Sequence, residues 1–224
     1  MRVSLVIAAH NEAETIGAVV EAAREVLGHT LIEAIVVDDG STDGTLEAAE
    51  RAGAHCYRLS PNRGKGSALR TGISASTGEW LVFIDADGQD DPREIPLLLA
   101  EAKGDTVMVN GSRFLGRLED GAISRPNYVG NRALTGVFNV LFGTRITDTQ
   151  AGFRAIRGDV ARHLALHATE YEIETEMLAH VLRRGYRVVE VPVTRYPRKA
   201  GVTDFKRIRN GLRILGTILS ERAR

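Results

Sequence analysis

The sequence predicts an α/β fold in which helices cover both faces of a mostly parallel central sheet. Two observations support this prediction. Continuous apolar runs of strand length alternate with helical patterns through the first half of the chain. Three of these runs end in polar clusters, as strands do where they meet at the carboxyl edge of such a sheet. The 224 residues are 43% hydrophobic and 26% charged, which is typical of a globular domain.

The first half of the chain alternates between the two kinds of element. The apolar runs predict strands at residues 3–8, 32–37, 54–59 and 80–84, and helical patterns between them predict helices at 12–27, 43–52 and 65–75. Strands that are apolar throughout are typical of a parallel sheet buried on both faces. Helices between consecutive strands are the crossovers that such a sheet requires.

The second half is less regular. We expect helices at residues 94–102, 128–142, 172–184 and 204–222, and strands at 106–111, 153–156 and 187–193. Residues 114–126 are polar and interrupted by glycine and proline, which predicts a loop. Because we find no internal repeat or linker, we expect residues 1–224 to form a single domain.

The polar cluster after the fourth predicted strand is Asp85-Ala-Asp87-Gly-Gln89. Alternate side chains of an extended chain share a face, so Asp85, Asp87 and Gln89 can converge on one point. Carboxylate oxygens suit Mg²⁺ or Mn²⁺, and Mg²⁺ sites typically combine one or two carboxylates with substrate phosphates. The cluster therefore indicates a divalent ion that holds a phosphorylated ligand, although an Asp-X-Asp pattern also recurs in turns.

Two further turns follow predicted strands. Asp39, after the second strand, can accept hydrogen bonds from a nucleobase or a ribose, whereas the alternative for this turn is helix capping by Ser41 or Asp43. Lys65 lies between two glycines where a helix begins, so it can contact a phosphate or a base, or belong to a solvated turn. The spacing of a P-loop is absent.

Several charged residues of the second half have both a functional and an ordinary interpretation. Arg113, Arg125 and Arg132 flank the central loop and can form a cationic phosphate site, or lie separately on the surface. Asp148 can be a base, an orienter of Arg154, or a turn residue.

Acidic and basic residues nearer the end of the chain can likewise belong either to the ligand site or to ordinary surface structure. Glu172, Glu174 and Glu176 lie near a helix start, where carboxylates are favourable, and the latter two can also reach the site. Residues 195–201 are basic and appear flexible; they can fold over a pyrophosphate or form a surface loop.

Charge is distributed unevenly along a chain whose net charge is zero. Residues 193–224 hold nine basic and two acidic residues, a net charge of +7. The last predicted helix places an apolar stripe beside these basic residues, formed by Phe205, Ile208, Leu212, Leu215 and Leu219. Such a helix can lie on an anionic membrane or pack on the domain or on a partner subunit. Nucleic acid is not expected as a partner, because no groove-reading element or stacking aromatics accompany the basic residues.

The compartment can also be anticipated from the sequence. A single cysteine, Cys56, excludes an internal disulfide and fits a reducing compartment. The first predicted strand leaves no room for a signal peptide, and no apolar stretch approaches the ~20 residues that span a bilayer. We therefore expect a cytoplasmic protein, either soluble or peripheral on the cytoplasmic face of a membrane.

These motifs, taken in order, resemble glycosyltransferase family 2. The resemblance rests on Val6 to Glu12, Val36 to Thr45, Asn62 to Gly66, Asp85 to Gly88 and Gly111 to Phe114, and it covers nearly the whole chain. Asp148-Thr-Gln-Ala-Gly-Phe-Arg154 is similar to the subgroup that glycosylates dolichyl or other polyprenyl phosphates. Arg-Lys-Ala-Gly-Val-Thr replaces the Gly-Ser-Lys element of many relatives, and the C-terminal transmembrane helices of many relatives are absent.

The resemblance implies a GT-A nucleotide-sugar-binding fold. Residues 1–111 would be the nucleotide-sugar-binding half, 112–202 the acceptor-side half, and 203–224 a basic amphipathic helix. The nucleotide sugar would be bound by Ala8, Asn11, Glu12, Asp39, Lys65, Asp85, Ala86 and Arg198. Mg²⁺ or Mn²⁺ would be held by Asp85, Asp87 and Gln89. The catalytic residues would be Asp87, Arg113, Arg125, Arg132 and Asp148, of which the arginines would meet the acceptor phosphate.

The expected activity is metal-dependent, inverting transfer of a sugar from a nucleotide sugar to dolichyl or polyprenyl phosphate. The motifs look closer to the dolichyl-phosphate glucosyltransferases than to the mannose synthases, which favours UDP-glucose or UDP-GlcNAc over GDP-mannose. Two alternatives remain at this point: a hydroxyl or soluble acceptor with Asp148 as base, and a non-catalytic nucleotide-binding subunit of a membrane complex. A homodimer or a membrane-protein partner is also open.

Overall fold

A single seven-stranded sheet organises the computed structural model, which describes residues 1–199 and 207–223. The strand order is β3-β2-β1-β4-β6-β5-β7. Every neighbouring pair is parallel except the two that involve β6, which runs antiparallel to β4 and β5. The strands are β1 (Val3–Ala9), β2 (Leu31–Asp38), β3 (His55–Arg58), β4 (Trp80–Phe83), β5 (Thr106–Leu118), β6 (Arg154–Arg157) and β7 (Arg187–Arg195). The predicted mostly parallel α/β fold is confirmed.

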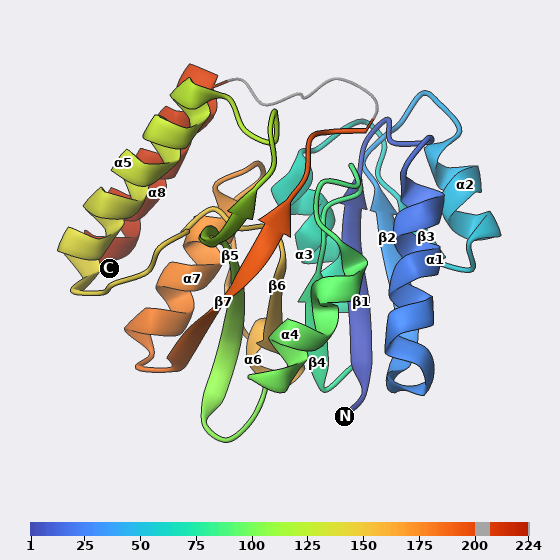
Figure 1. Ribbon diagram of the computed structural model, residues 1–224, viewed down its shortest axis with the longest axis horizontal. Coiled ribbons are helices and arrows are strands. Elements are labelled where there is room, and N and C mark those ends of the chain that lie inside the picture. The colour runs from blue at the N-terminus through green and yellow to red at the C-terminus, as the bar shows by residue number, and fades with distance from the viewer. Residues whose placement is uncertain (200–206, 224) are drawn as a thin grey trace.

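Helices cover both faces of this sheet (Figure 1). They are α1 (Ile16–Leu27), α2 (Thr45–Arg51), α3 (Lys65–Ala75), α4 (Ile95–Ala100), α5 (Arg125–Phe142), α6 (Gly158–Ala161), α7 (Ile173–Arg183) and α8 (Arg207–Ala223), with short 3₁₀ turns η1 (Gly28–Thr30) and η2 (Pro92–Glu94). Residues 204–206 of the last predicted helix, including Phe205, lie outside the described residues.

The two faces of the sheet hold two hydrophobic clusters. Alternate residues of β1 separate between them: Leu5 and Ile7 pack with α1, α2 and α4, whereas Val6 packs with α3, α6, α7 and α8. This alternation is the period of two expected of a strand buried on both sides. It explains why β1, β2 and β4 are largely apolar, whereas the polar groups that line the cavity follow the carboxyl ends of these strands.

The predicted loop at residues 114–126 is wrong at both of its ends. β5 continues to Leu118 and α5 already begins at Arg125. After a register shift that follows Ser112, Arg117 and Leu118 pair with Thr194 and Arg195 of β7. The extension, Phe114 to Leu118, is largely exposed, and Gly116 is required in it because a Cβ atom there would lie 2.0 Å from a β7 carbonyl oxygen. Sequence composition therefore resembles a loop where the structure has a long strand.

Helix α5 lies beside α8 at one end of the molecule (Figure 1). It follows Ser124, whose backbone is extended, and ends at Gly143 in the left-handed conformation (φ +66°) that favours glycine at this position. Phe138 is fully buried and stacks on Phe142 with ring centroids 4.3 Å apart. Since Thr135 is the other buried residue of α5, Phe138 is the main apolar anchor of this helix.

We expect Phe138→Ala to lower the free energy of unfolding by about 3–5 kcal/mol, because it empties a fully buried aromatic site. Urea unfolding followed by circular dichroism measures this loss. Val140→Ala is the matched control on the same helix; Val140 is 83% exposed, and a change within about 0.5 kcal/mol is expected. Equal effects of the two substitutions would contradict the assigned role of Phe138.

Candidate active site

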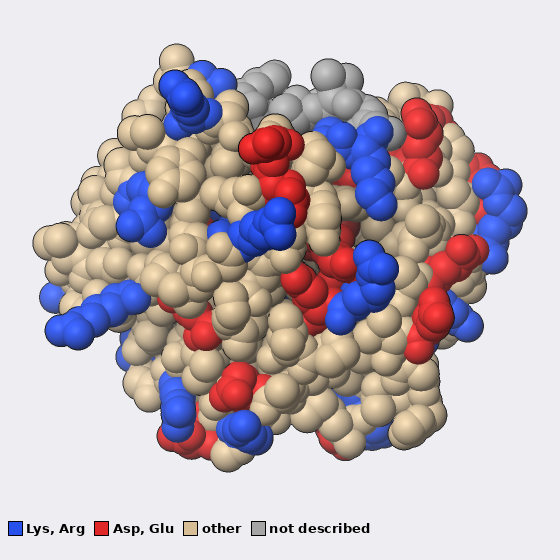
Figure 2. Space-filling view, viewed as in Figure 1, with Lys and Arg blue, Asp and Glu red and all other residues tan. Residues whose placement is uncertain are grey.

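A cavity of about 700 Å³ lies at the carboxyl edge of the parallel strands. The segments that follow β1, β2 and β4 form one side of it, and residues of α5 and α8 form the other. Acidic and basic side chains gather near the centre of the face shown in Figure 2. The predicted meeting of three polar strand ends is thus realised at one cavity.

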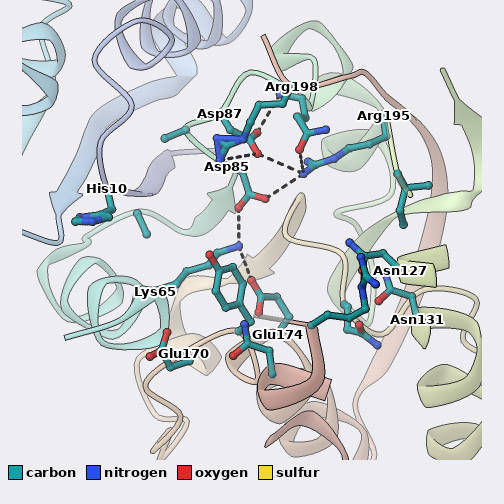
Figure 3. A pocket seen from close by; sticks show the side chains of 18 of the residues that line it. His10, Lys65, Asp85, Asp87, Asn127, Asn131, Glu170, Glu174, Arg195 and Arg198 are labelled. Carbon is teal, nitrogen blue, oxygen red and sulfur yellow. Dashed lines mark hydrogen bonds and ion pairs between the residues drawn. The ribbon is translucent and has the colours of Figure 1, made fainter. Parts of the chain in front are cut away.

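Lys65 and Arg195 hold the acidic groups of this cavity together (Figure 3). The Nζ atom of Lys65 lies 2.6 Å from Asp85 Oδ1 and 2.7 Å from Glu174 Oε1. Arg195 is the last residue of β7, and its guanidinium lies 3.7 Å from Asp85 and 3.6 Å from Asp87. It also donates to Asp90 at 2.6 Å. Two cations therefore connect four carboxylates from separate parts of the chain.

The pKa values reflect this pairing. Burial alone would raise the pKa of Asp85, but Lys65 and Arg195 outweigh it and hold that pKa well below its usual range. Asp85 and Glu174 in turn raise the pKa of Lys65 against the effect of its burial. For Asp90, burial dominates and raises the pKa to about 6, despite the contact with Arg195. Asp85 is therefore ionised, and Lys65 charged, at neutral pH.

Asp85 and Asp87 fit a divalent metal ion. Their Oδ2 atoms accept no hydrogen bond from any residue in the described ranges, and both side chains line the cavity. Hard carboxylate oxygens that lack hydrogen-bond donors are the ligands that Mg²⁺ or Mn²⁺ prefers. Gln89 also lines the cavity, but its amide nitrogen donates to Ala122 and Tyr196 and its oxygen accepts from Arg195. The two aspartates are thus better placed for a metal than the glutamine.

Glu12 and Arg198 form an ion pair beside the aspartates. Both terminal nitrogens of Arg198 donate to Glu12 Oε1, at 2.7 and 2.8 Å, and one of them lies 3.7 Å from Asp87. Burial raises the pKa of Glu12 to about 7, although Arg198 acts in the opposite direction. The basic stretch that begins at residue 195 thus reaches the cavity, through Arg195 and Arg198.

Asp39 and Asn11 shape the turns around the cavity. The two oxygens of Asp39 accept backbone N–H bonds from Arg63 and Gly64, each at 2.7 Å, so this carboxylate fixes the turn before Lys65. Asn11 accepts the backbone N–H of Thr42 and does not line the cavity. Asp43, a predicted capping residue, accepts the N–H of Thr45 at the start of α2.

Arg113 and Asp148 pair with each other. Arg113 donates to both oxygens of Asp148, at 2.6 and 2.8 Å, and Asp148 is fully buried. Although burial raises its pKa, Arg113 outweighs that effect and lowers the pKa of Asp148. Asp148 therefore orients Arg113, a partner that the sequence interpretation did not name. The expected partner, Arg154, instead donates to the backbone oxygens of Ala151 and Glu174.

Some of the remaining predicted residues reach the cavity and others do not. Ala8 and Ala86 line the cavity, whereas Arg125 and Arg132 do not. Arg132 instead lies over the ring of Phe114, 5.4 Å from its centroid. Of the three glutamates, Glu174 reaches the cavity through Lys65, whereas Glu172 and Glu176 accept backbone N–H bonds between residues 167 and 170.

Sequence interpretation missed several residues that line the cavity: Asn127, Asn131, Tyr171, Arg207, Arg209 and Asn210. Arg195 was expected in a flexible stretch that could fold over a pyrophosphate; it reaches the cavity, but as the last residue of β7, with 11% of its side chain exposed. The only available signal was the alternation of Val191, Val193 and Arg195, which places all three on one face of a strand. The residues of α5 and α8 carried no signal, since polar side chains on amphipathic helices usually face solvent.

Comparisons with known proteins bear on the family and the fold. Residues 4–164 match the family described as glycosyl transferase family 2. The chain is 34% identical over 204 residues to glycosyltransferase AglJ of Haloferax volcanii, covering 90% of this chain and 66% of AglJ, just under two thirds of its length. It is 33% identical over 215 residues to the undecaprenyl-phosphate mannosyltransferase of Micrococcus luteus, covering 90% and 86% of the two chains.

Solved structures support the GT-A fold. The glucosyl-3-phosphoglycerate synthase of Mycobacterium tuberculosis, crystallised with uridine diphosphate, superposes with a TM-score of 0.80. The alignment covers 99% of this chain and 80% of that one at 23% sequence identity. The fold expected from the sequence resemblance is therefore confirmed.

We expect Arg195→Met to lower the free energy of unfolding by about 3–5 kcal/mol, because it leaves buried carboxylates without their cation. Urea unfolding measures the loss. Arg117→Met is the control, since Arg117 pairs with Glu119 in solvent and is 76% exposed; about 0–1 kcal/mol is expected there. A loss at Arg195 no larger than that at Arg117 would show that the acidic groups do not depend on this arginine.

A second prediction concerns Glu12 and pH. Because the pKa of Glu12 is raised from 4.5 to about 7, the neutral form is favoured in the folded state. Its contribution to stability is fully present below pH 4.5 and is lost as the pH rises through about 7. The stability of the wild type relative to Glu12→Gln should therefore fall by about 1–2 kcal/mol across this window. Urea unfolding without nucleotide sugar measures it, and a constant difference contradicts the raised pKa.

Proposed function

The chain belongs to glycosyl transferase family 2, and we propose that it transfers a sugar from a nucleotide sugar to dolichyl or another polyprenyl phosphate, with inversion at the anomeric carbon. The proposed donor is UDP-glucose or UDP-GlcNAc, with GDP-mannose next. The proposed unit is one domain over residues 1–224. The observation that carries the proposal is the pair Asp85 and Asp87, which line a cavity together with Lys65, Arg195 and Arg198. Their Oδ2 atoms accept no hydrogen bond from the described residues and lie 3.6–3.7 Å from the nearest arginine nitrogens.

A phosphate acceptor is favoured by the basic residues of the cavity. Arg113, Arg207 and Arg209 line it in addition to the three cations near the aspartates. Arginine forks match phosphate oxygens, so a cavity with several arginines suits a donor pyrophosphate together with an acceptor phosphate. Similarity to the undecaprenyl-phosphate mannosyltransferase of Micrococcus luteus supports the same class of acceptor.

The proposed reaction is a direct displacement. An oxygen of the acceptor phosphate attacks the anomeric carbon, the bond from that carbon to the donor phosphate breaks, and a nucleoside diphosphate leaves. Since the second pKa of a phosphate monoester is about 6, the acceptor is already anionic at neutral pH and needs no dedicated base. Mg²⁺ or Mn²⁺ held by Asp85 and Asp87 would supply charge stabilisation for the leaving group.

The chain's own residues would mainly position the two phosphate groups. Lys65 fixes the orientation of Asp85, and Asp39 holds the turn that carries Lys65. When the donor binds, Arg198 would release Glu12 and pair with the donor phosphates instead. Glu12 would then be available to accept a hydrogen bond from the nucleoside. Arg113, held by Asp148, is the predicted acceptor arginine that lines the cavity. Positioning and electrostatic stabilisation of this kind account for a large part of phosphate-centred catalysis.

The alternative with Asp148 as a base gains no support from its surroundings. Asp148 is fully buried, and Arg113 occupies both of its oxygens. A non-catalytic subunit is disfavoured because the acidic residues expected for metal binding are all present. Among the described residues, no helix has the length and apolar character to cross a bilayer. We propose that the protein works on the cytoplasmic face of a membrane, where its acceptor would reside.

The test of this function is a panel of UDP-glucose, UDP-GlcNAc and GDP-mannose, each offered with a short polyprenyl phosphate and with the corresponding alcohol. Sugar transfer to the phosphate with one donor, and none to the alcohol, is expected. Transfer to the alcohol at a similar rate would contradict a phosphate acceptor, and no transfer with any donor would contradict the proposed function.

We expect Asp87→Ala to lower kcat by about a thousandfold or more, because it removes a carboxylate that would hold the metal at the leaving group. Steady-state kinetics across a Mn²⁺ titration measures the effect. Asp105→Ala is the control, since Asp105 is 75% exposed and pairs with Arg187 outside the cavity. Retention of wild-type turnover by Asp87→Ala in the presence of metal would contradict the metal assignment.

A further inference from the structure

The first described turn of α8 joins the cavity to a shallow, open groove on the outside of the molecule. Arg207 and Arg209 line the cavity, and the same two residues line the groove together with Ile208, Leu212 and Arg213. A ligand that occupies both spaces must therefore pass these two arginines. None of the residues predicted from the sequence to bind a ligand lies in this groove.

The cavity wall beside this junction is made of cations and amides. Asn127 and Asn131 extend from α5 on one side (Figure 3), and the Nε of Arg207 donates to Asn127 Oδ1 at 2.8 Å. Asn210 of α8 is 4% exposed and lines the cavity, yet its amide makes no hydrogen bond within the parts of the chain that the structure describes. An amide that lines a cavity without a protein partner is available to hydrogen-bond a polar ligand there.

The charge at this end of the cavity suits an anion. The lining residues that α5 and α8 contribute include two arginines and no carboxylate. Glu170, on the neighbouring segment, lies 3.3 Å from Arg213 and is thereby partly neutralised. Of the carboxylates that hold Lys65 and Arg195, Asp85, Asp87 and Asp90 follow β4, and Glu174 belongs to α7. The side of the cavity formed by the strand ends therefore holds carboxylates together with cations and suits a metal, whereas the side formed by α5 and α8 is basic and suits a second phosphate.

The groove itself is apolar. Ile208 and Leu212 are 78% and 65% exposed and lie one helical turn apart, so they share one face of α8. Large apolar side chains are unfavourable in water, so when they are exposed beside a ligand cavity they favour a ligand whose apolar part packs on them. The basic junction and the apolar groove together match a phosphate group joined directly to a hydrocarbon chain.

We propose that α8 is an acceptor-binding element: Arg207, Arg209 and the amides of Asn127, Asn131 and Asn210 bind the acceptor phosphate, and Ile208 and Leu212 cover the beginning of its hydrocarbon chain. This inference rests on the proposed function and extends it. It makes a prenyl phosphate the acceptor class and excludes sugar phosphates, which have no apolar segment for the groove. It also adds residues of α5 and α8 to acceptor binding beyond Arg113, the predicted acceptor arginine that lines the cavity.

The experiment compares geranyl phosphate with isopentenyl phosphate, which is shorter by one isoprenoid unit. With the full chain and its preferred nucleotide sugar, we expect the KM for geranyl phosphate to be lower by about tenfold, because the additional unit is buried in the groove. The variant with both Ile208→Gln and Leu212→Gln should lose this preference. Leu219→Gln is the matched control, on the same helix, 52% exposed and outside the groove, and it should keep the preference.

A second variant tests the phosphate contacts. Arg207→Gln combined with Arg209→Gln should raise the KM for both prenyl phosphates by about tenfold and leave the KM for the nucleotide sugar unchanged. The inference is overturned if the groove variant keeps the chain-length preference. It is also overturned if Leu219→Gln loses the preference to the same extent, which would indicate general contact with micelles or membranes.

Failure of the proposed function can be recognised separately. If the wild type transfers sugar to neither prenyl phosphate with any nucleotide sugar of the panel, the function is contradicted. Calorimetric titration of geranyl phosphate into the same proteins then decides the inference alone. Weaker binding by the Ile208 and Leu212 variant than by the wild type and Leu219→Gln supports it, and equal binding by all three overturns it.

Discussion

The ion pairs of Lys65 and Arg195 are the interactions on which the site depends. Buried carboxylates are unfavourable unless a cation compensates for the loss of solvent. These two side chains allow Asp85, Asp87, Asp90 and Glu174 to gather at one edge of the sheet. They also connect distant parts of the chain, because Lys65 begins α3 and Arg195 ends β7. The same contacts therefore neutralise the site and hold its walls together.

This arrangement divides the cavity by charge. The side formed by the strand ends supplies carboxylates together with the cations that pair with them, whereas α5 and α8 supply amides and arginines and no carboxylate. An enzyme that moves a sugar from a nucleotide sugar to an acceptor phosphate has to hold two anionic groups close to one carbon atom. A cation-binding side and an anion-binding side within one cavity meet that requirement, because each anion then has its own compensating charge.

The parallel strands, their polar ends and the family were predictable because they depend on local sequence and on motif order. Asp85, Asp87 and Lys65 were identified in this way, and they line the cavity. The role of Arg195 was not predictable, since its place in β7 depends on pairing with Leu118, a residue 77 positions away along the chain that itself resembled a loop. Surface and cavity arginines have the same local sequence character, so Arg132 and Arg207 could be distinguished only by the tertiary structure.

The antiparallel direction of β6 lets one part of the site change without disturbing the parallel strands. Its direction places the start of β6, rather than its end, at the edge where the cavity lies, so the segment that leads into it crosses the site. Gly152 of this segment packs against Asp85, where a Cβ atom would lie 2.9 Å from a carboxylate oxygen. Residues 143–150 connect α5 to this point without belonging to any parallel strand. Replacements or insertions in these residues can reshape the acceptor side of the cavity while β1, β2 and β4 remain paired. Acceptor specificity can therefore change without a change in the strands that bind the donor.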